Sequence, residues 1–322
     1  MPTILITEHV HPDALAYLRQ ETSFEVVEAA GDPAIIRSAL AHAEAIGVRV
    51  HRLDAAAIDA APRLKVIAKH GVGTDNIDHA AASARGIVIL NTPDANKVAV
   101  AEHAMALMLA LAKRLAIHDA TLRAGDWRFR EGLVAQELAG RSLAILGFGR
   151  SGQELARRAA AFDMPIIAWG RSIDSAAVER FGGRVASSLG EALSSADFVS
   201  LHTPRVHASR PLLGVDEIAT MRQGAYLINC ARGGLVDEQA LADALRENRL
   251  AGAGVDVFDV EPPPADNPLL AADLPNLILT PHNAGNTRET TRRVGLEMVD
   301  NIIAGLQGRH DVSRIVRPPR PS

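Results

Sequence analysis

The feature that most constrains this chain is a regular alternation of short apolar segments with longer alanine- and leucine-rich segments of helical spacing. This alternation is typical of β-α-β units, in which helices cover both faces of a parallel sheet. The apolar segments form two series along the chain. The first series comprises residues 4–7, 24–28, 45–50, 64–68 and 87–90. The second comprises residues 143–148, 165–169, 197–202, 225–230, 252–258 and 277–281.

Two series of strands predict two sheets and therefore two domains. A chain of 322 residues is also too long for one ordinary hydrophobic core. We predict an α/β fold of two Rossmann-like, doubly wound parallel-sheet domains with a cleft between them. Residues 98–122, which carry apolar side chains at helical spacing between the two series, are expected to form a buried connecting helix.

Composition excludes several classes of protein. A chain with a net charge of -4 lacks the overall basic excess that is typical of nucleic-acid-binding proteins, although it leaves room for a local basic patch. The apolar stretch 104–112 is far shorter than the ~20 residues of a membrane span, and the N-terminus has no signal-peptide pattern, so we expect a cytoplasmic protein without membrane contact. Cys230 is the single cysteine, which excludes an internal disulfide and a cysteine-rich metal site; no metal is expected.

The second series opens with a strand that runs into a G-x-G-x-x-G sequence, followed by a helical segment. Its members are Gly147, Phe148, Gly149, Arg150, Ser151 and Gly152. In such a turn Gly147 permits the tight bend, Gly149 lets the backbone approach a pyrophosphate, and Gly152 lets helix and strand pack closely. The helix N-terminus offers N–H groups to the phosphates. The alternative, a plain tight turn, is disfavoured by the strand before it and the helix after it.

The end of the next strand bears on the choice of cofactor. Dinucleotide folds usually place an acid there, which binds the ribose 2′-hydroxyl. Here Gly170 stands at the expected position, followed by Arg171 and Ser172. Since these side chains suit a 2′-phosphate and a carboxylate would repel one, we expect NADP(H) to be favoured, with NAD(H) as the alternative.

Six blocks in order along the chain carry a resemblance to a known family. They are KHGVGTDNID, NTPDANKVAVAEHA, GFGRSG, INCARGGLVDEQAL, GVDVFDVEP and TPHNAGNT. Over nearly its whole length the chain resembles the D-2-hydroxyacid dehydrogenases, a family containing phosphoglycerate, glycerate/hydroxypyruvate and D-lactate dehydrogenases. The resemblance implies hydride transfer between NAD(P)H and a small 2-keto acid or D-2-hydroxy acid.

The resemblance also implies the catalytic residues. Arg232 would bind and polarise the 2-keto acid, His282 would be the acid/base, and Glu261 would orient and tune His282. Arginine presents a permanently charged planar donor fork, and histidine side chains titrate near neutral pH. Each of the three follows a strand of the second series, so they are expected at the carboxyl ends of that sheet.

Further cofactor contacts are implied at positions that match the family's motifs. They are Thr203, Pro204, Cys230, Ala231, Asp256 and Gly285, with Asp256 accepting from the nicotinamide carboxamide. His202 precedes two of these residues and is expected to be structural. Cys230 has no base beside it in sequence and is expected to be an inert wall residue.

Gly71, Val72 and Gly73 resemble the family's substrate-binding loop, whose backbone N–H groups bind the substrate carboxylate. Glycine favours this arrangement because it has no side chain to obstruct the anion. Lys69 stands where phosphoglycerate members carry a basic residue. It is expected either to meet a second anionic group, as in phosphoglycerate or sulfolactate, or to be a solvated lysine at the strand end.

The family's pattern divides the chain into a substrate domain of residues 1–98 plus 285–322 and a dinucleotide-binding domain of residues 99–284, and it implies a homodimer. The main alternative is a catalytically silent dinucleotide sensor or corepressor-like binding protein, which the intact Arg232, Glu261 and His282 disfavour. A formate dehydrogenase is a further alternative, but that subgroup carries Gln where Glu261 stands.

Overall fold

A computed structural model describes residues 3–132, 135–205 and 210–316. The chain divides into two compact units, unit 1 of Met1–Asn96 with Asn286–Ser322 and unit 2 of Lys97–Gly285. The boundaries expected from the sequence differ from these by no more than two residues (98 against 96, and 285 against 286). Each unit contains one sheet, and all the strand pairs in both sheets are parallel, which confirms the predicted fold class.

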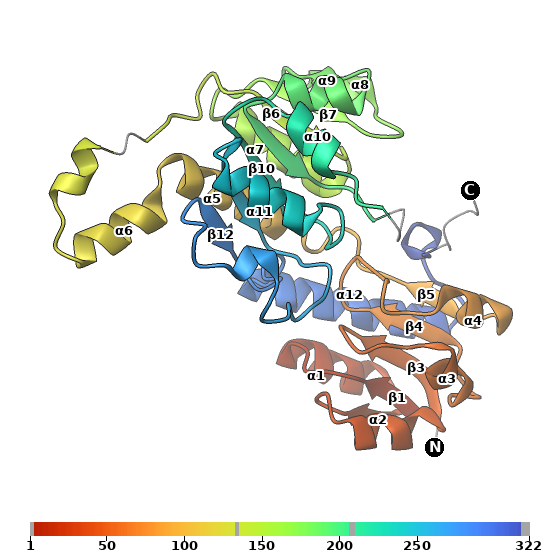
Figure 1. The fold of residues 1–322 in the computed structure, drawn as a ribbon. Coiled ribbons are helices and arrows are strands. Elements are labelled where there is room, and N and C mark those ends of the chain that lie inside the picture. Colours follow the sequence, from red (N-terminus) through yellow and green to blue (C-terminus); the bar gives the residue numbers. More distant parts are fainter. Residues whose placement is uncertain (1–2, 133–134, 206–209, 317–322) are drawn as a thin grey trace. The chain divides into compact units, whose positions relative to one another are not determined.

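Unit 1 is built around a five-stranded sheet of order β2-β1-β3-β4-β5. The strands are β1 (Thr3–Ile6), β2 (Glu25–Glu28), β3 (Ala43–Val48), β4 (Val66–Lys69) and β5 (Val88–Leu90). The helices are α1 (Pro12–Glu21), α2 (Pro33–Leu40), α3 (Ala55–Asp59), α4 (His79–Ala84) and α12 (Arg288–Leu306), with the 3₁₀ turn η3 (Val312–Arg314). Helix α12 comes from the far end of the chain and packs beside α1 (Figure 1).

Both faces of this sheet are buried, as expected for a parallel sheet covered by helices. On β1, Ile4 and Ile6 face one core with Met298 of α12, whereas Leu5 between them faces the other core with Ile36 of α2. Successive side chains of a strand point to opposite faces, so a continuous apolar run supplies both cores. This explains why the strands of the first series are apolar at nearly every position.

Unit 2 contains a seven-stranded sheet of order β12-β11-β10-β9-β6-β7-β8. The strands are β6 (Leu143–Leu146), β7 (Ile166–Trp169), β8 (Arg184–Val185), β9 (Phe198–Leu201), β10 (Ala225–Asn229), β11 (Leu250–Val255) and β12 (Leu277–Leu279). The helices are α5 (Lys97–Ala112), α6 (Leu115–Arg123), α7 (Arg150–Ala160), α8 (Ser175–Glu179), α9 (Leu189–Ser194), α10 (Val215–Thr220) and α11 (Glu238–Arg246), with η1 (Arg128–Glu131) and η2 (Pro268–Leu270). Only the two-residue strand β8 has no counterpart among the expected strands.

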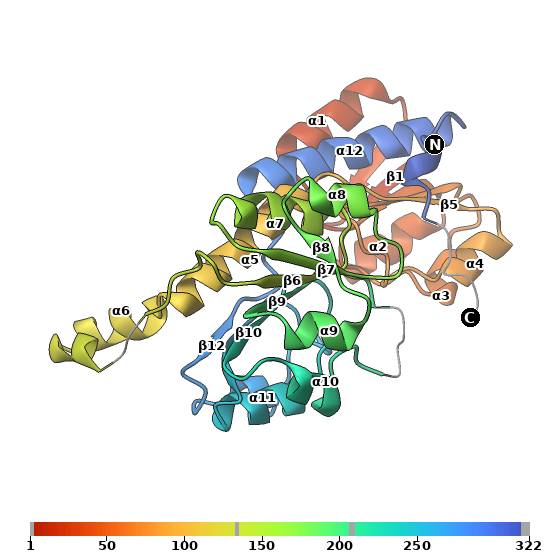
Figure 2. The same ribbon diagram turned by 90° about the horizontal axis from the view of Figure 1, so that it is seen from above.

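The expected connecting helix over residues 98–122 is wrong in one respect, because two helices occupy this stretch. Helix α5 packs against α7 and the sheet, and half of its residues are buried. Arg114 then adopts a left-handed backbone conformation (φ 52°) and ends the helix. Helix α6 has no buried residue and, with η1, extends away from the strands of unit 2 (Figures 1 and 2). We call residues 115–131 the arm.

Among the described residues, no helix combines the length and the hydrophobicity that crossing a membrane would require.

Candidate active site

The glycine-rich turn lies between β6 and α7, in the strand-turn-helix setting expected from the sequence. Gly147 has a φ of 99°, and a Cβ there would lie 2.5 Å from the carbonyl oxygen of His202. A Cβ on Gly152 would lie 2.4 Å from the oxygen of Gly147, whereas the space beside Gly149 is open. The N-cap residue of α7, Gly149, makes no side-chain cap hydrogen bond, and the N-terminus of a helix is a favourable place for an anion. This cradle fits the pyrophosphate of a dinucleotide.

The carboxyl end of β7 lies beside this turn. The Gly147 N–H donates to the Trp169 carbonyl over 2.7 Å. A Cβ on Gly170 would lie 3.7 Å from the Gly147 Cα, and Arg171 and Ser172 follow as exposed residues. The nearest acid along the chain, Asp174, caps α8 by accepting from the Ala176 N–H. Its carboxylate is therefore engaged within the protein.

The segment after β9 forms the other wall of the turn. His202 accepts or donates at both ring nitrogens, to Ser200 Oγ at 3.0 Å and to Ser151 Oγ at 3.1 Å. Burial lowers the pKa of His202 to about 4, so its imidazole is neutral near pH 7. Thr203 Oγ1 donates to the Pro204 carbonyl, so this hydroxyl lies along the chain at the edge of the turn.

Arg232 stands in a tight turn after β10. The Asn229 side chain holds the turn from within, because its amide nitrogen donates to the Arg232 carbonyl (3.0 Å) and its oxygen accepts from the Ala231 N–H (3.1 Å). A Cβ on Gly233 would lie 1.7 Å from the Phe258 carbonyl oxygen. Only glycine therefore allows the arginine turn to lie directly against the segment that leads to Glu261.

His282 and Glu261 form a hydrogen-bonded pair of ionisable side chains. His282 Nδ1 lies 2.7 Å from Glu261 Oε2, and the Phe258 N–H donates to the other carboxylate oxygen over 3.0 Å. Burial acts to raise the pKa of Glu261, but the hydrogen bonds from His282 and Phe258 and the charge of Arg232 outweigh it and lower this pKa. An ionised Glu261 accepts from Nδ1–H, which leaves Nε2 of the half-exposed His282 for another group.

Asp256 holds the loop that carries His282. This fully buried side chain accepts from the N–H groups of Asn283 (2.8 Å) and Ala284 (2.9 Å) and from the Thr280 hydroxyl. His103 of α5 lies 3.0 Å from the same hydroxyl. The carboxylate of Asp256 is thus bonded to protein groups in this structure, and its expected contact with a nicotinamide carboxamide stays a prediction.

Two other expected contacts lie beside these groups. Cys230 is buried at the end of β10, and burial, with the Asp256 charge, raises the pKa of its thiol. A neutral buried thiol agrees with an inert wall residue. Gly285, at the last position of unit 2, follows the loop held by Asp256.

In unit 1, the loop of Gly71, Val72 and Gly73 follows β4. The Gly71 N–H donates to Thr92 Oγ1 over 3.1 Å, and the Asn91 amide donates to the Val72 carbonyl over 2.8 Å. Within the described part of the chain, the N–H groups of Val72 and Gly73 donate to no protein acceptor. Thr92 and Asn91 therefore fix the loop from within unit 1, and the loop still presents the Val72 and Gly73 N–H groups as donors.

Lys69 lies inside unit 1 and is only 8% exposed. Its ammonium group donates to the Arg49 carbonyl and, over 2.6 Å, to Asn76 Oδ1. The expectation of a solvated lysine at the strand end is wrong, because the side chain is buried and its ammonium group is bonded to the loops beside the strand end. A contact with a second anionic group of the substrate stays a prediction.

Five polar residues that order the loops of the two units were not expected from the sequence, namely Glu8, Asn76, His103, Ser200 and Asn229. A sequence signal for some of them exists, because Ser200 and Asn229 interrupt apolar strands, and buried polar side chains require partners. Their partners lie far along the chain, as with His103 and Thr280, which are 177 positions apart.

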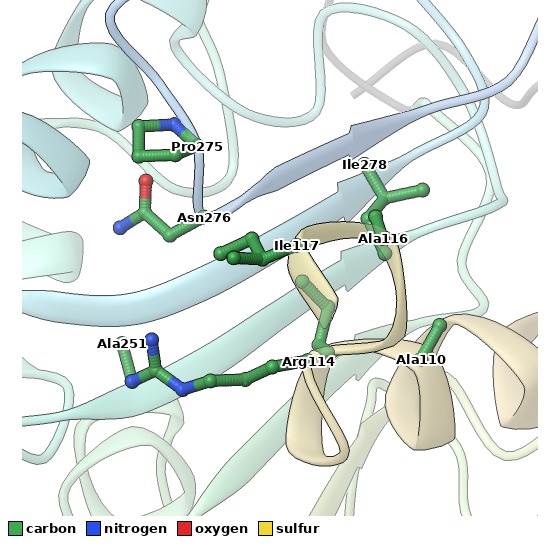
Figure 3. Close-up of a pocket in the computed structure, with 9 residues that line it drawn as sticks. Ala110, Arg114, Ala116, Ile117, Ala251, Pro275, Asn276 and Ile278 are labelled. Atoms are coloured by element: carbon green, nitrogen blue, oxygen red, sulfur yellow. The ribbon is translucent and has the colours of Figure 1, made fainter. Parts of the chain in front are cut away.

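A small pocket in unit 2 lies elsewhere, at the turn between α5 and α6 (Figure 3). Its lining comprises Ala110, Leu111, Arg114, Ala116, Ile117, Ala251, Pro275, Asn276 and Ile278. None of these residues was expected at the active site. The pocket is mostly apolar and opens where the arm leaves the body of unit 2 (Figure 3).

A doubly wound unit with a glycine-rich turn, an arginine turn and a His–Glu pair defines a dinucleotide-binding protein equipped for proton transfer. Residues 105–284 match the family model of the D-isomer specific 2-hydroxyacid dehydrogenase NAD-binding domain, and the chain belongs to this family. This confirms the resemblance noted from the sequence.

Individual relatives agree with this assignment. The chain is 38% identical over 309 residues to the D-3-phosphoglycerate dehydrogenase of Methanocaldococcus jannaschii, covering 96% of this chain but 58% of that protein. It is 41% identical over 249 residues to the hydroxypyruvate reductase of Thermotoga maritima, covering 77% of this chain and 80% of that one. The crystal structure of the TT0316 protein from Thermus thermophilus superposes with a TM-score of 0.88 at 38% identity, over 98% and 100% of the two chains.

Proposed function

We propose that the chain transfers a hydride between a nicotinamide dinucleotide and a small 2-keto acid, giving a D-2-hydroxy acid, or runs the reverse reaction. The observation that carries the proposal is the 2.7 Å hydrogen bond between His282 and Glu261 in the unit that also holds the glycine-rich turn. The dinucleotide, when bound, supplies or accepts the hydride. The residues of the chain must then move one proton and balance the charge of the substrate.

In the proposed mechanism, Glu261 accepts from Nδ1–H of His282 and thereby fixes the ring so that Nε2 faces the substrate. For reduction, protonated His282 donates from Nε2 to the carbonyl oxygen of the keto acid; for oxidation, neutral His282 takes the hydroxyl proton. Arg232, whose turn lies against the Glu261 segment, binds the substrate carboxylate and polarises the carbonyl.

The N–H groups of Val72 and Gly73 are proposed to bind the substrate carboxylate as well. Support comes from unit 1 alone, where both amides donate to no protein acceptor among the described residues. Small 2-keto acids share a carboxylate next to the reacting carbonyl, so amides and a guanidinium recognise the class rather than one member. Glyoxylate and hydroxypyruvate are the first substrates to test by reduction. Phosphoglycerate and sulfolactate, which are 2-hydroxy acids, are tested next by oxidation with NADP⁺ and NAD⁺.

We propose NADPH as the favoured reduced cofactor. Support comes from the end of β7, where Arg171 and Ser172 are exposed and Asp174 is engaged in capping α8. A guanidinium attracts a 2′-phosphate, whereas the carboxylate that usually stands here would repel it.

A panel of 2-keto acids, assayed by absorbance loss of NADPH and of NADH, tests the proposal. Turnover of at least one keto acid, abolished in His282→Gln, is the expected result. Tight dinucleotide binding without turnover of any member would favour the sensor or corepressor-like alternative. Formate oxidation would contradict the role given to Glu261, because hydride leaves formate without proton transfer.

The arm is proposed to join two copies of the chain into a homodimer. Leu115, Leu122 and Trp127 are each more than half exposed on it, at 55%, 55% and 63%. Exposed apolar groups in one place are typical of protein interfaces. Light scattering should give a dimer for the wild type and a monomer for Leu122→Glu with Trp127→Glu. Val312→Glu, at an exposed position of unit 1, is the control and should remain dimeric.

A cytoplasmic location is part of the same proposal. It is supported by the single, buried cysteine, since a chain without disulfides needs no oxidising compartment. Fractionation of the producing cells, with immunodetection of the chain, tests it, and recovery in a membrane or secreted fraction would contradict it.

A further inference from the structure

A chain of three polar side chains crosses the point in the unit 2 sheet where the strand order reverses. Ser200 on β9, His202 just after it and Ser151 in the first turn of α7 are linked by contacts of 3.0 and 3.1 Å. The glycine-rich turn follows β6, and β6 and β9 are neighbours in the sheet although β7 and β8 lie between them in sequence. Crevices at such reversal points are where α/β sheets bind ligands.

Burial assigns the direction of these hydrogen bonds. The Ser200 side chain is fully buried, and His202 is its partner within the described part of the chain. A buried hydroxyl must donate its hydrogen, so Ser200 donates to Nε2 of His202. The neutral ring then carries its hydrogen on Nδ1, and Nδ1–H donates to Ser151 Oγ. The Ser151 hydroxyl hydrogen is thereby left for a different acceptor.

The position of Ser151 indicates what that acceptor is. Ser151 is partly exposed, within the glycine-rich sequence and at the uncapped N-terminus of α7. The space beside Gly149, two residues earlier, is open. The His202 carbonyl touches the Gly147 side of the turn, so one residue supports the turn with both its backbone and its ring. A hydroxyl hydrogen presented here meets the oxygens of a phosphate group.

We propose that Ser200 and His202 are positioning residues that fix the Ser151 hydroxyl as a hydrogen-bond donor to the pyrophosphate of the dinucleotide. The inference rests on the proposed function in that it requires a bound dinucleotide, and it adds three residues that act on cofactor affinity. In this arrangement Ser200 acts on the cofactor without contacting it. Its hydroxyl selects the ring tautomer, and the tautomer decides whether Ser151 donates outward or back to the ring.

Titration of protein fluorescence with NADPH and NADH tests the proposal through Kd rather than turnover. Ser151→Ala removes one hydrogen bond to a charged group and should raise Kd about 10-fold. Ser200→Ala no longer fixes the tautomer, so Ser151 can donate to Nδ1, and Kd should rise in the same direction by roughly 3–10-fold. The double variant should bind no more weakly than Ser151→Ala, because both changes remove the same contact.

Conservative and control variants separate positioning from folding. His202→Asn keeps an N–H near the position of Nδ1 and should retain a near wild-type Kd, whereas His202→Leu should match Ser151→Ala. Ser142→Ala is the matched control: this hydroxyl donates to the Ser195 carbonyl just before the amino-terminal ends of β6 and β9, away from the glycine-rich turn at their carboxyl ends. It should lower Tm and leave Kd unchanged. The Tm of every variant is measured by thermal unfolding, so that a variant with lower affinity can be distinguished from one that has lost its fold.

An unchanged Kd in Ser151→Ala, or independent, additive effects of Ser151→Ala and Ser200→Ala, would overturn the inference. A wild-type chain that binds neither dinucleotide would overturn it together with the proposed function. A wild-type chain that binds NADPH and reduces a keto acid, with additive serine effects, would overturn this inference alone.

Discussion

The two units use related topologies with opposite results at the reversal point of the sheet. In unit 1 the strand order reverses between β1 and β3, and in unit 2 between β6 and β9. Both points place a loop after the first strand of the unit opposite a loop from a later strand. Such a crevice is the general ligand position of open α/β sheets. The residues in the two crevices differ in kind.

In unit 1, Glu8 follows β1 and fills the crevice. Its carboxylate accepts from the N–H groups of Arg49 (2.9 Å), Val50 (2.9 Å) and His51 in the loop after β3, and from the Thr7 hydroxyl. The loop is held from the other side by Lys69, which donates to the Arg49 carbonyl. A negative side chain that already occupies these amides leaves no place for a phosphate.

In unit 2 the corresponding position after β6 carries glycines, and no atom would lie within 4 Å of a Cβ on Gly149. The turn after β6 therefore has no carboxylate in the place of Glu8, and the N-cap residue of α7, Gly149, has no side chain that could fill the space. The order of strands therefore supplies a crevice in both units. The side chain after the first strand decides whether that crevice can bind a ligand or is filled by the protein itself.

The largest effect is expected where chemistry depends on unit 2. His282→Gln removes the acid/base group and should lower kcat by ~10²–10⁴-fold. Kd for NADPH should stay within twofold of wild type, since His282 pairs with Glu261 and not with the glycine-rich turn. His42→Gln, at an exposed position of unit 1, is the control. Normal turnover in His282→Gln would contradict the acid/base role given to His282.

A side chain at the glycine-rich turn should close the second crevice. In Gly147→Ala, the backbone has a φ of 99° and the new Cβ would lie 2.5 Å from a carbonyl oxygen. The variant should therefore lower the stability of unit 2 by roughly 2–4 kcal/mol and weaken NADPH binding. Denaturant unfolding and fluorescence titration measure both effects. Gly31→Ala, at a φ of 86° in unit 1 with open space around it, should show the backbone strain of roughly 1 kcal/mol alone. Equal effects at the two glycines would contradict the close packing of the turn.

Opening the first crevice should cost stability and leave cofactor binding intact. Glu8→Gln removes a carboxylate that accepts several hydrogen bonds and should lower the free energy of unfolding by about 2 kcal/mol at pH 7. Burial acts to raise the pKa of Glu8, but its hydrogen bonds with Thr7 and three amides outweigh burial and lower this pKa below its ordinary value of 4.5.

The sign of the pH dependence follows from that direction. A carboxyl group with a lowered folded-state pKa contributes stability above its unfolded pKa, near 4.5, and loses it as the pH falls through the folded value. The stability difference between wild type and Glu8→Gln should therefore be constant above about pH 5 and shrink in more acid solution. A difference that grows on acidification, or a weaker Kd for NADPH, would show that Glu8 does not act as described.

The smallest expected effect concerns which dinucleotide enters the open crevice. Arg171→Ala removes a cation from the end of β7 and should lower the ratio of kcat/KM for NADPH to that for NADH about 10-fold. Arg180→Ala, an exposed arginine after α8, is the matched control and should leave the ratio unchanged. A wild-type preference for NADH would contradict the argument from Arg171.

Much of this architecture could be predicted because it is encoded in local patterns. Strands buried on both faces appear as continuous apolar runs, and a glycine-rich turn between such a run and a helix is visible without a partner. The break at Arg114 was not predictable from the helical spacing, since α6 continues the same spacing on an exposed arm. The pairing of Glu8 with residues 49–51 was also missed, because a lone acid after a strand has no local signature.

The sequence by itself determined the two sheets, the glycine-rich turn and the kinds of side chain available for catalysis. The tertiary structure decided which of these meet: His282 with Glu261, 21 positions away, and His202 with Ser151, 51 positions away. It also decided that Lys69 points inward and that Glu8 closes one crevice. The reason is physical, since backbone preferences act over a few residues, whereas hydrogen-bond partners are selected by the order in which strands lie side by side in the sheet.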